Sequence, residues 1–223
     1  MAEIVIRPFE WQRDLWPTVE MVYQVWFADA KSEMAGRLSA CNFLVHYLRQ
    51  GTTLKVACEG DTILGVMAYT NKREAPVLSA ARSRFVAAQA ALLEGVCMLG
   101  MYLWPHSSVP RLFHEKFFVN YQRMRAMVAR PQDPELLLLL VAAAAQGKGV
   151  GRKMMQEVAS DLRAQGFSSY YLLTDSSCNW GFYERMGMTK TLDVAMNFGI
   201  PHVKGYEHYL NMYLRALIYE QAL

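Results

Sequence analysis

The chain has 223 residues, of which 53% are hydrophobic and 19% are charged, and its formal net charge is +3. This length suits one large domain or one domain with an insertion, and the apolar fraction is sufficient for a packed core, so a disordered chain is excluded. The net charge is too small to indicate nucleic acid as a partner.

The four cysteines, Cys41, Cys58, Cys97 and Cys178, show neither CxxC spacing nor a histidine pattern typical of metal ligands. They are typical of reduced, mostly buried thiols, and they favour neither a disulfide framework nor a zinc site. The first residues, MAEIVIRPFEW, lack the apolar stretch of a signal peptide. We therefore expect a cytoplasmic protein without a bound metal.

Hydrophobic patterning predicts secondary structure along the whole chain. In chain order, we expect a strand over 3–9, one or two helices over 11–27, a helix over 39–51 that ends at Gly51, a hairpin over 53–70 that turns at EGD, helices within 73–134, a strand over 135–142, a helix over 150–165, a strand over 168–175, a short helix over 179–187, and strands near 189–197 and 206–215.

Residues 85–104, FVAAQAALLEGVCMLGMYLW, are almost entirely apolar over about the length that crosses a bilayer. Gln89 and Glu94 lie inside this stretch, and Pro105 follows it. Because a carboxylate in the middle of a membrane is costly, we expect a buried helix of a soluble protein and no stable membrane insertion.

A glycine-rich, basic turn, QGKGVG, follows an apolar strand over 135–142 that is typical of burial on both faces. Glycines let the backbone approach a ligand closely, and unpaired N–H groups at the next helix start carry the positive end of the helix dipole. Lys148, Arg152 and Lys153 add positive charge. The turn therefore indicates a phosphate or pyrophosphate site, although neither GxGxxG nor GxxxxGK[ST] is present. A tight turn with a solvated basic edge is the alternative.

The order of these motifs resembles that of the GNAT superfamily of N-acetyltransferases. QGKGVG matches the family's pyrophosphate loop, Gln/Arg-x-x-Gly-x-Gly/Ala, and the strand YYLLTD, then Asn179, then FYERMGM follow in the family's order. The resemblance is specific over 135–190 and looser over 1–70. Asn179 stands four positions before Tyr183, which is closer than in many members.

The resemblance implies an α+β fold in which a central mixed, mostly antiparallel sheet is flanked by helices. It implies one domain over 1–223, with a helical insertion over 73–134. It also implies direct transfer of an acetyl group from acetyl-CoA to a primary amine of a small molecule or peptide. Tyr183 matches the tyrosine that protonates the CoA sulfur. The positions that match the family's CoA-binding residues are Val141, Ala142, Ala143, Gln146, Gly147, Lys148, Gly149, Val150, Gly151, Arg152 and Asn179.

The general base is less well defined. Glu135 opens the strand on which several family members have a basic carboxylate, and a solvated residue of the turn PQDPE is the alternative. Asp175, Glu115, His114 and water are further candidates. Cys178 is a lone cysteine without a located base, which is typical of inert packing.

The insertion over 73–134 is too long and apolar for a simple loop, and we expect it to cover the acceptor side with a wall that includes Met98, Met101, Met124 and Met127. Its eight basic residues outnumber its four acidic ones. This balance favours an acceptor that is neutral, apolar or carboxylate-bearing apart from its amine, and disfavours polycations. The alternative roles of the segment are a homodimer interface or a thickening of the hydrophobic core. For the whole chain, the alternatives are a catalytically inactive CoA-binding sensor and a membrane-associated or partner-binding protein.

Overall fold

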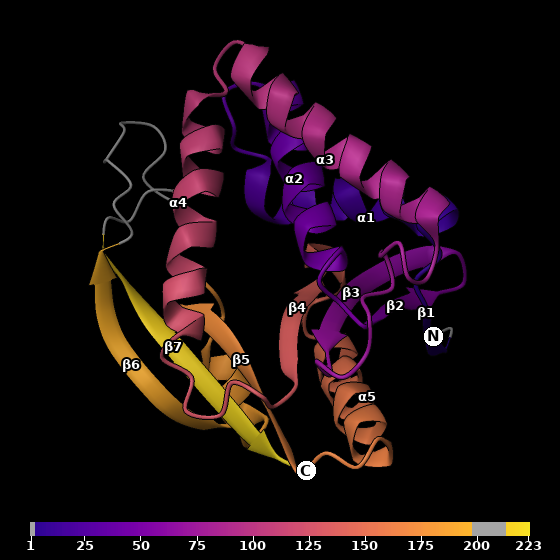
Figure 1. The fold of residues 1–223 in the computed structure, drawn as a ribbon, viewed down its shortest axis with the longest axis vertical. Helices are drawn as coiled ribbons and strands as arrows, with labels where there is room; N and C mark the ends of the chain where they lie inside the picture. Colours follow the sequence, from indigo (N-terminus) through magenta and orange to yellow (C-terminus); the bar gives the residue numbers. More distant parts are fainter. Residues whose placement is uncertain (1–2, 198–212) are drawn as a thin grey trace.

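The computed structural model of the protein describes residues 3–197 and 213–223. Within these residues, seven strands form one mixed sheet in the order β1-β2-β3-β4-β5-β7-β6 (Figure 1). Among the neighbouring pairs of this described sheet, β4 and β5 run parallel and the others are antiparallel. The predicted fold class, a mostly antiparallel mixed sheet flanked by helices, is confirmed.

The N-terminal part of the sheet is an antiparallel meander of β1 (Ile4–Pro8), β2 (Thr53–Glu59) and β3 (Thr62–Thr70). Between β1 and β2 lie α1 (Trp11–Val22), a π-helical segment η1 (Tyr23–Phe27) that continues it, and α2 (Glu33–Leu48). The helix expected over 39–51 begins earlier, because the Ser32 hydroxyl accepts a hydrogen bond from the Ala35 N–H at 3.3 Å and caps it.

Two helices, α3 (Arg84–Leu103) and α4 (Ser108–Arg125), lie between β3 and β4 in the chain. Figure 1 shows α3 running along the outside of α2, and α4 descending from the tip of this helical pair towards the start of β4.

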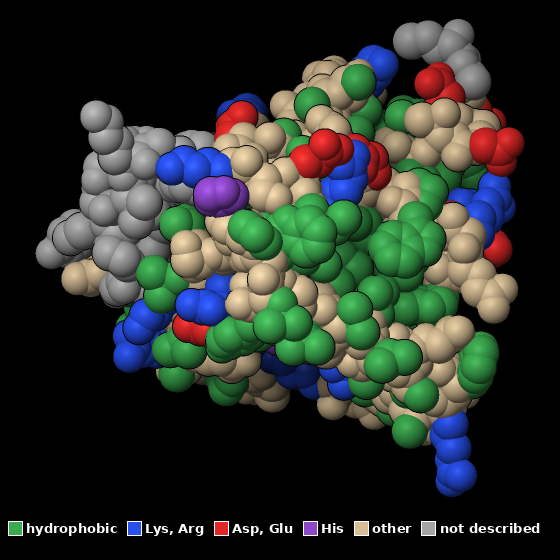
Figure 2. Space-filling view, turned by 90° about the horizontal axis from the view of Figure 1, so that it is seen from above, with side chains coloured by type: hydrophobic (Ala, Val, Ile, Leu, Met, Phe, Trp, Pro, Cys, Tyr) green, Lys and Arg blue, Asp and Glu red, His purple; other side chains and the backbone are tan. Residues whose placement is uncertain are grey.

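The prediction that 85–104 forms a buried helix is wrong for most of its surface. Ala90, Cys97 and Met101 of α3 are buried, whereas Leu92 and Leu103 are 70% and 75% exposed. Figure 2, seen from the side on which α3 lies, shows hydrophobic side chains spread between the charged ones. Among the described residues, α3 is the one helix long and apolar enough to cross a membrane by length and composition. The apolar composition of α3 does not reveal how few helices and strands pack against it, so its exposure could not be predicted from the sequence.

The C-terminal part follows the predicted order closely. It contains β4 (Glu135–Val141), α5 (Val150–Ala164), β5 (Ser169–Asp175), α6 (Gly181–Arg185), β6 (Thr189–Asn197) and β7 (Tyr213–Ala222). The last strand was expected near 206–215, of which 206–212 lie outside the described residues. The described strand continues to Ala222 because 216–219 are buried without interruption between β5 and β6, so its pattern is not an alternation.

Hydrophobic cores fill both faces of the sheet. On one face, side chains from α1, α2 and α4 pack together, with Leu44, Leu48 and Met124 fully buried. On the other face, α5 contributes Met154 and Val158. The central strands β4 and β5 therefore lie between two packed layers.

Candidate active site

The sheet opens between β4 and β5. These strands pair at Glu135 with Tyr171 and at Leu136 with Leu172, and they then diverge. A β-bulge lies at the same place: Tyr69 of β3 opposes Leu136, but Ala68 opposes Leu138, so Leu137 is an extra residue in β4. The bulge interrupts the alternation of the strand, so Leu136 packs on the α5 side and Leu138 on the opposite side.

The turn after β4 has the geometry of an anion site. Gly147 and Gly149 both have φ +79°, and no atom lies within 4 Å of the place where a Cβ would stand on either. Gly149 is the N-cap of α5 and offers no side chain, and the Lys153 N–H donates to its carbonyl at 3.0 Å. The N–H groups of residues 150–152 precede this first helical bond and have no intrahelical acceptor, so they can bind an anionic oxygen.

Two basic side chains flank these amides. Lys148 and Arg152 are exposed, and neither forms an ion pair with a described residue. The Lys153 ammonium instead donates to the Ile4 carbonyl. Gly151 has a different role from its neighbours, because a Cβ there would lie 3.3 Å from the Phe182 ring, so this glycine lets α5 pack closely against α6.

Among the predicted amide donors, the Ala142 N–H donates to the Leu64 carbonyl at 2.8 Å and thus faces β3. Because N–H groups alternate in direction along an antiparallel ladder, the Val141 N–H faces the gap. Asn179 is exposed, and its carbonyl accepts from the Phe182 N–H at 3.1 Å at the start of α6.

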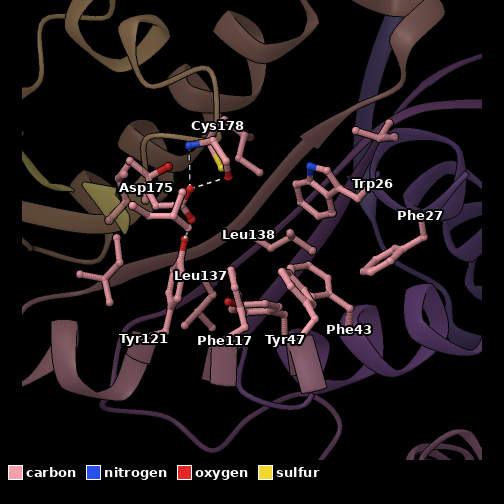
Figure 3. Close-up of a pocket in the computed structure, with 18 of the residues that line it drawn as sticks. Trp26, Phe27, Phe43, Tyr47, Phe117, Tyr121, Leu137, Leu138, Asp175 and Cys178 are labelled. Carbon is pink, nitrogen blue, oxygen red and sulfur yellow. Dashed lines mark hydrogen bonds between the residues drawn. The ribbon is translucent and has the colours of Figure 1, made fainter. Parts of the chain in front are cut away.

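A cavity of about 250 Å³ occupies the gap on the side of α2 and α4 (Figure 3). Leu136–Leu139 of β4 and Leu172–Asp175 of β5 form one wall, and Tyr183 and Cys178 also line it. The opposite wall is aromatic and is built by η1, α2 and α4. Its members are Trp26, Phe27, Phe43, Tyr47, Phe113, Phe117 and Tyr121.

Of the segment 73–134, which was expected to cover the acceptor side, α4 lines the cavity, but the predicted methionine wall is wrong. Met101 and Met124 are buried elsewhere in the core, Met127 is exposed, and none of the four methionines lines the cavity. The aromatic side chains of α4 repeat every four residues from Phe113 to Tyr121, which places them on one helix face. This spacing was the signal in the sequence that could have identified the wall.

Asp175 is the carboxylate that the cavity buries. Its side chain lies at the end of β5 and is 1% exposed. One oxygen accepts a hydrogen bond from the Tyr121 hydroxyl at 2.9 Å, and the other accepts from the Ser177 N–H at 2.8 Å and from the Ser177 hydroxyl (Figure 3). Within the described residues, no Lys, Arg or His forms an ion pair with it.

The other candidate bases lie apart from the cavity. Glu135, at the closed end of the gap, accepts from Arg125 Nε at 2.8 Å, from Arg125 Nη2 at 2.7 Å and from the Tyr171 hydroxyl at 2.9 Å. Glu115 accepts from the exposed Tyr102 hydroxyl. His114 is buried behind the aromatic wall, and burial lowers its pKa to about 3. The structure thus brings Asp175, and none of these three, to the cavity wall.

Residues 9–188 match the family model described as "Acetyltransferase (GNAT) family". The chain belongs to the GNAT family. A search of curated proteins finds none that matches the sequence.

Solved structures share the GNAT fold at low sequence identity. The C-terminal condensation domain of Ebony, in complex with beta-alanyl-dopamine, has a TM-score of 0.60 at 11% identity, with 100% of each chain covered. A GNAT-family protein from Desulfovibrio desulfuricans has a TM-score of 0.52 at 16% identity, with 99% of each chain covered. The ribosomal-protein-S18-alanine N-acetyltransferase from Escherichia coli has a TM-score of 0.52 at 12% identity and covers 99% of this chain and 94% of its own.

Two groups of this GNAT protein's cavity are held protonated by burial. Tyr183 is half-buried, and desolvation raises the pKa of its hydroxyl, with the nearby Cys178 adding to the rise. Burial also raises the pKa of Cys178 to about 11, and the charge of Asp175 contributes. At neutral pH, Tyr183 can therefore donate a proton, whereas Cys178 is a poor nucleophile.

Proposed function

We propose that this GNAT protein transfers an acetyl group from acetyl-CoA directly to a primary amine. One observation carries the proposal: the gap between β4 and β5 opens towards the end of β4 from which the glycine turn leads to the bare N-terminus of α5, and it contains a cavity whose wall includes both a carboxylate, Asp175, and a phenol, Tyr183. Acetyl transfer to an amine needs an anion site for CoA, an acceptor of the amine proton and a donor to the departing sulfur.

The glycine turn fits the pyrophosphate of CoA, since open space lies in front of Gly147 and Gly149 and the first amides of α5 are uncapped. The N–H groups of 150–152, with Lys148 and Arg152, would hold the phosphates. The Val141 N–H, on the gap side of β4, would donate to the thioester carbonyl and stabilise its developing negative charge.

Acetyl-CoA supplies the activated acyl group. Asp175 accepts a proton from the ammonium of the acceptor, and the free amine then forms a bond to the acetyl carbon as the carbon–sulfur bond breaks. Tyr183 donates its proton to the departing sulfur and regains one from the nitrogen, which loses this second proton as it becomes an amide, and the proton on Asp175 passes to solvent. The products are an acetamide and the CoA thiol. Because Cys178 stays protonated, no acyl-enzyme step is included.

The structural neighbours support an amine acceptor without identifying it. Ebony's condensation domain was solved with an amide of dopamine, and the Escherichia coli enzyme acts on the alanine of a ribosomal protein. A small amide of dopamine and a ribosomal protein differ greatly in size, so we infer the acceptor from this chain's own cavity.

The test is acetyl-CoA binding by calorimetry together with thiol release in the presence of a panel of amines, with the acetylated product identified by mass spectrometry. We expect binding, and thiol release that depends on an amine. Tight binding without turnover of any amine would favour the CoA-binding sensor, and absence of binding would contradict the whole proposal.

A further inference from the structure

Among the residues that the structure describes, no cation pairs with the buried carboxylate of Asp175. Carboxylates are rarely fully buried unless they are paired, because removing a charge from water is costly. Glu135, the comparable buried carboxylate nearby, has Arg125 as its partner. Asp175 receives only neutral donors from the described residues: the Tyr121 hydroxyl and the N–H and hydroxyl of Ser177.

Asp175 still has room for one more donor. An ionised carboxylate offers about four lone-pair positions, and the three hydrogen bonds from Tyr121 and Ser177 occupy three of them. The carboxylate also lines the cavity. A donor that arrives in the cavity with a positive charge would complete both the hydrogen bonding and the charge of Asp175.

The remainder of the cavity fits an aromatic group. Rings of the opposite wall lie against one another in stacked and tilted pairs, with centroids 4.2 Å apart for Phe117 and Tyr121 and 4.9 Å apart for Phe43 and Tyr47. Trp26 meets Phe43 edge-on at 5.0 Å. Such walls bind a further ring by offset or edge-to-face contacts and also attract cations. The volume, about 250 Å³, is below the roughly 300 Å³ at which pockets for drug-sized ligands begin.

The charged residues of the cavity lining further limit which amines it can accept. Its described lining includes two carboxylates, Asp175 and, at the exposed end of η1, Asp29, and it includes no Lys, Arg or His. An acceptor with its own carboxylate would find no cationic partner among these residues and would be repelled by Asp175. The excess of basic residues on the insertion over 73–134 is therefore not found in the cavity lining. Of the acceptors that this excess favoured, those that bear a carboxylate are disfavoured.

We infer that the cavity binds a small arylalkyl amine without a carboxylate, whose ammonium pairs with Asp175 and whose ring packs between Phe43, Tyr47 and Phe117. This inference rests on the proposed acetyl transfer and specifies its acceptor. The carboxylate that binds the ammonium is also placed to take its proton before transfer.

Binding is tested with two ligands of the same shape, 2-phenylethylamine and its neutral counterpart 2-phenylethanol. Calorimetry is done on the wild type, on Asp175→Asn and on Asp133→Asn, a matched change outside the cavity. We expect Asp175→Asn to weaken the amine roughly thirtyfold or more while the alcohol changes less than threefold, because only the amine loses an ion pair. Asp133→Asn should leave both affinities unchanged. Equal effects of Asp175→Asn on both ligands would overturn the pairing and indicate a structural role.

Acceptor choice is tested on the wild type alone, so it does not depend on whether a variant folds. Tyramine and tyrosine differ by one carboxylate, and spermidine represents polycations. We expect kcat/KM for tyramine to exceed those for tyrosine and spermidine by at least about tenfold. Preference for tyrosine or spermidine, with acetyl-CoA bound and consumed, would overturn this inference and leave acetyl transfer intact. Failure to bind acetyl-CoA would contradict the proposed function itself.

Discussion

Substitution of Gly149 by aspartate separates the anion-binding role of the glycine turn from its structural role. Gly149 and Gly166 have nearly the same backbone, φ +79° and +78°, and neither has an atom within 4 Å of an added Cβ. Gly149 precedes α5 and Gly166 follows it. Gly149→Asp and Gly166→Asp should therefore incur a similar conformational cost of about 1–2 kcal/mol in free energy of unfolding.

Their effects on acetyl-CoA should differ. A carboxylate about 4 Å from the pyrophosphate is opposed by about 4 kcal/mol at an effective dielectric constant of 20, which corresponds to about a thousandfold loss of affinity. We expect this loss in Gly149→Asp, measured by calorimetry at low ionic strength, and less than a threefold change in Gly166→Asp. Unaltered binding by a folded Gly149→Asp protein would refute the placement of the phosphates, and equal loss in both variants would point to general destabilisation.

Four further changes test individual side chains. Tyr183→Phe should lower kcat by roughly a hundredfold or more with little change in acetyl-CoA affinity, since it removes the proton donor alone; wild-type kcat would limit Tyr183 to packing. Glu135→Gln leaves the half-buried Arg125 without its charged partner and should lower the free energy of unfolding, measured in urea, by about 3 kcal/mol, while the folded protein keeps its turnover; loss of turnover in the folded variant would instead assign the base to Glu135. Cys178→Ala should keep its turnover, and an inactive but folded variant would contradict direct transfer. In the wild type, Cys178 should be alkylated about tenfold faster for each pH unit up to its pKa of about 11, as peptide mass spectrometry would show. Burial lowers the pKa of His114 to about 3 in the folded protein, so between pH 6.5 and pH 3 this imidazole is protonated only in the unfolded chain. The free energy of unfolding should therefore fall as the pH drops through this range, by about 2 kcal/mol at pH 5. His114→Leu should lose less stability than the wild type between pH 7 and pH 5, as urea midpoints would show.

Features set by local sequence could be predicted. The apolar run of β4, the glycines after it and the amphipathic α5 each follow from a pattern within one segment, and the predicted bounds of β4 and α5 differ from the structure by one residue at most. The same holds for β6, which lies at the predicted 189–197.

Features set by neighbours in space could not be predicted in the same way. The composition of α3 is that of a core helix, but its exposure depends on how many elements cover it, and the sequence does not state this. The cavity brings together Trp26, Phe117 and Asp175 from distant parts of the chain. From the sequence, both Glu135 and Asp175 were candidates for the general base. The structure distinguishes them, because Arg125 pairs with Glu135.

The bulge at Leu137 lies where the β4–β5 pairing ends, so the opening of the sheet is linked to the number of residues in β4. If that residue were deleted, Leu138 would directly follow Leu136, and β4 would regain an uninterrupted alternation with these two side chains on opposite faces. The strand could then continue its pairing with β5, and the space for the acceptor would close. Changes in loop length are commonly tolerated in evolution, but β4 could not lose this one residue without losing the opening, even if every side chain in the cavity were retained. A search for proteins that share this chemistry should therefore compare the register of β3 and β4 before it compares the identity of catalytic residues.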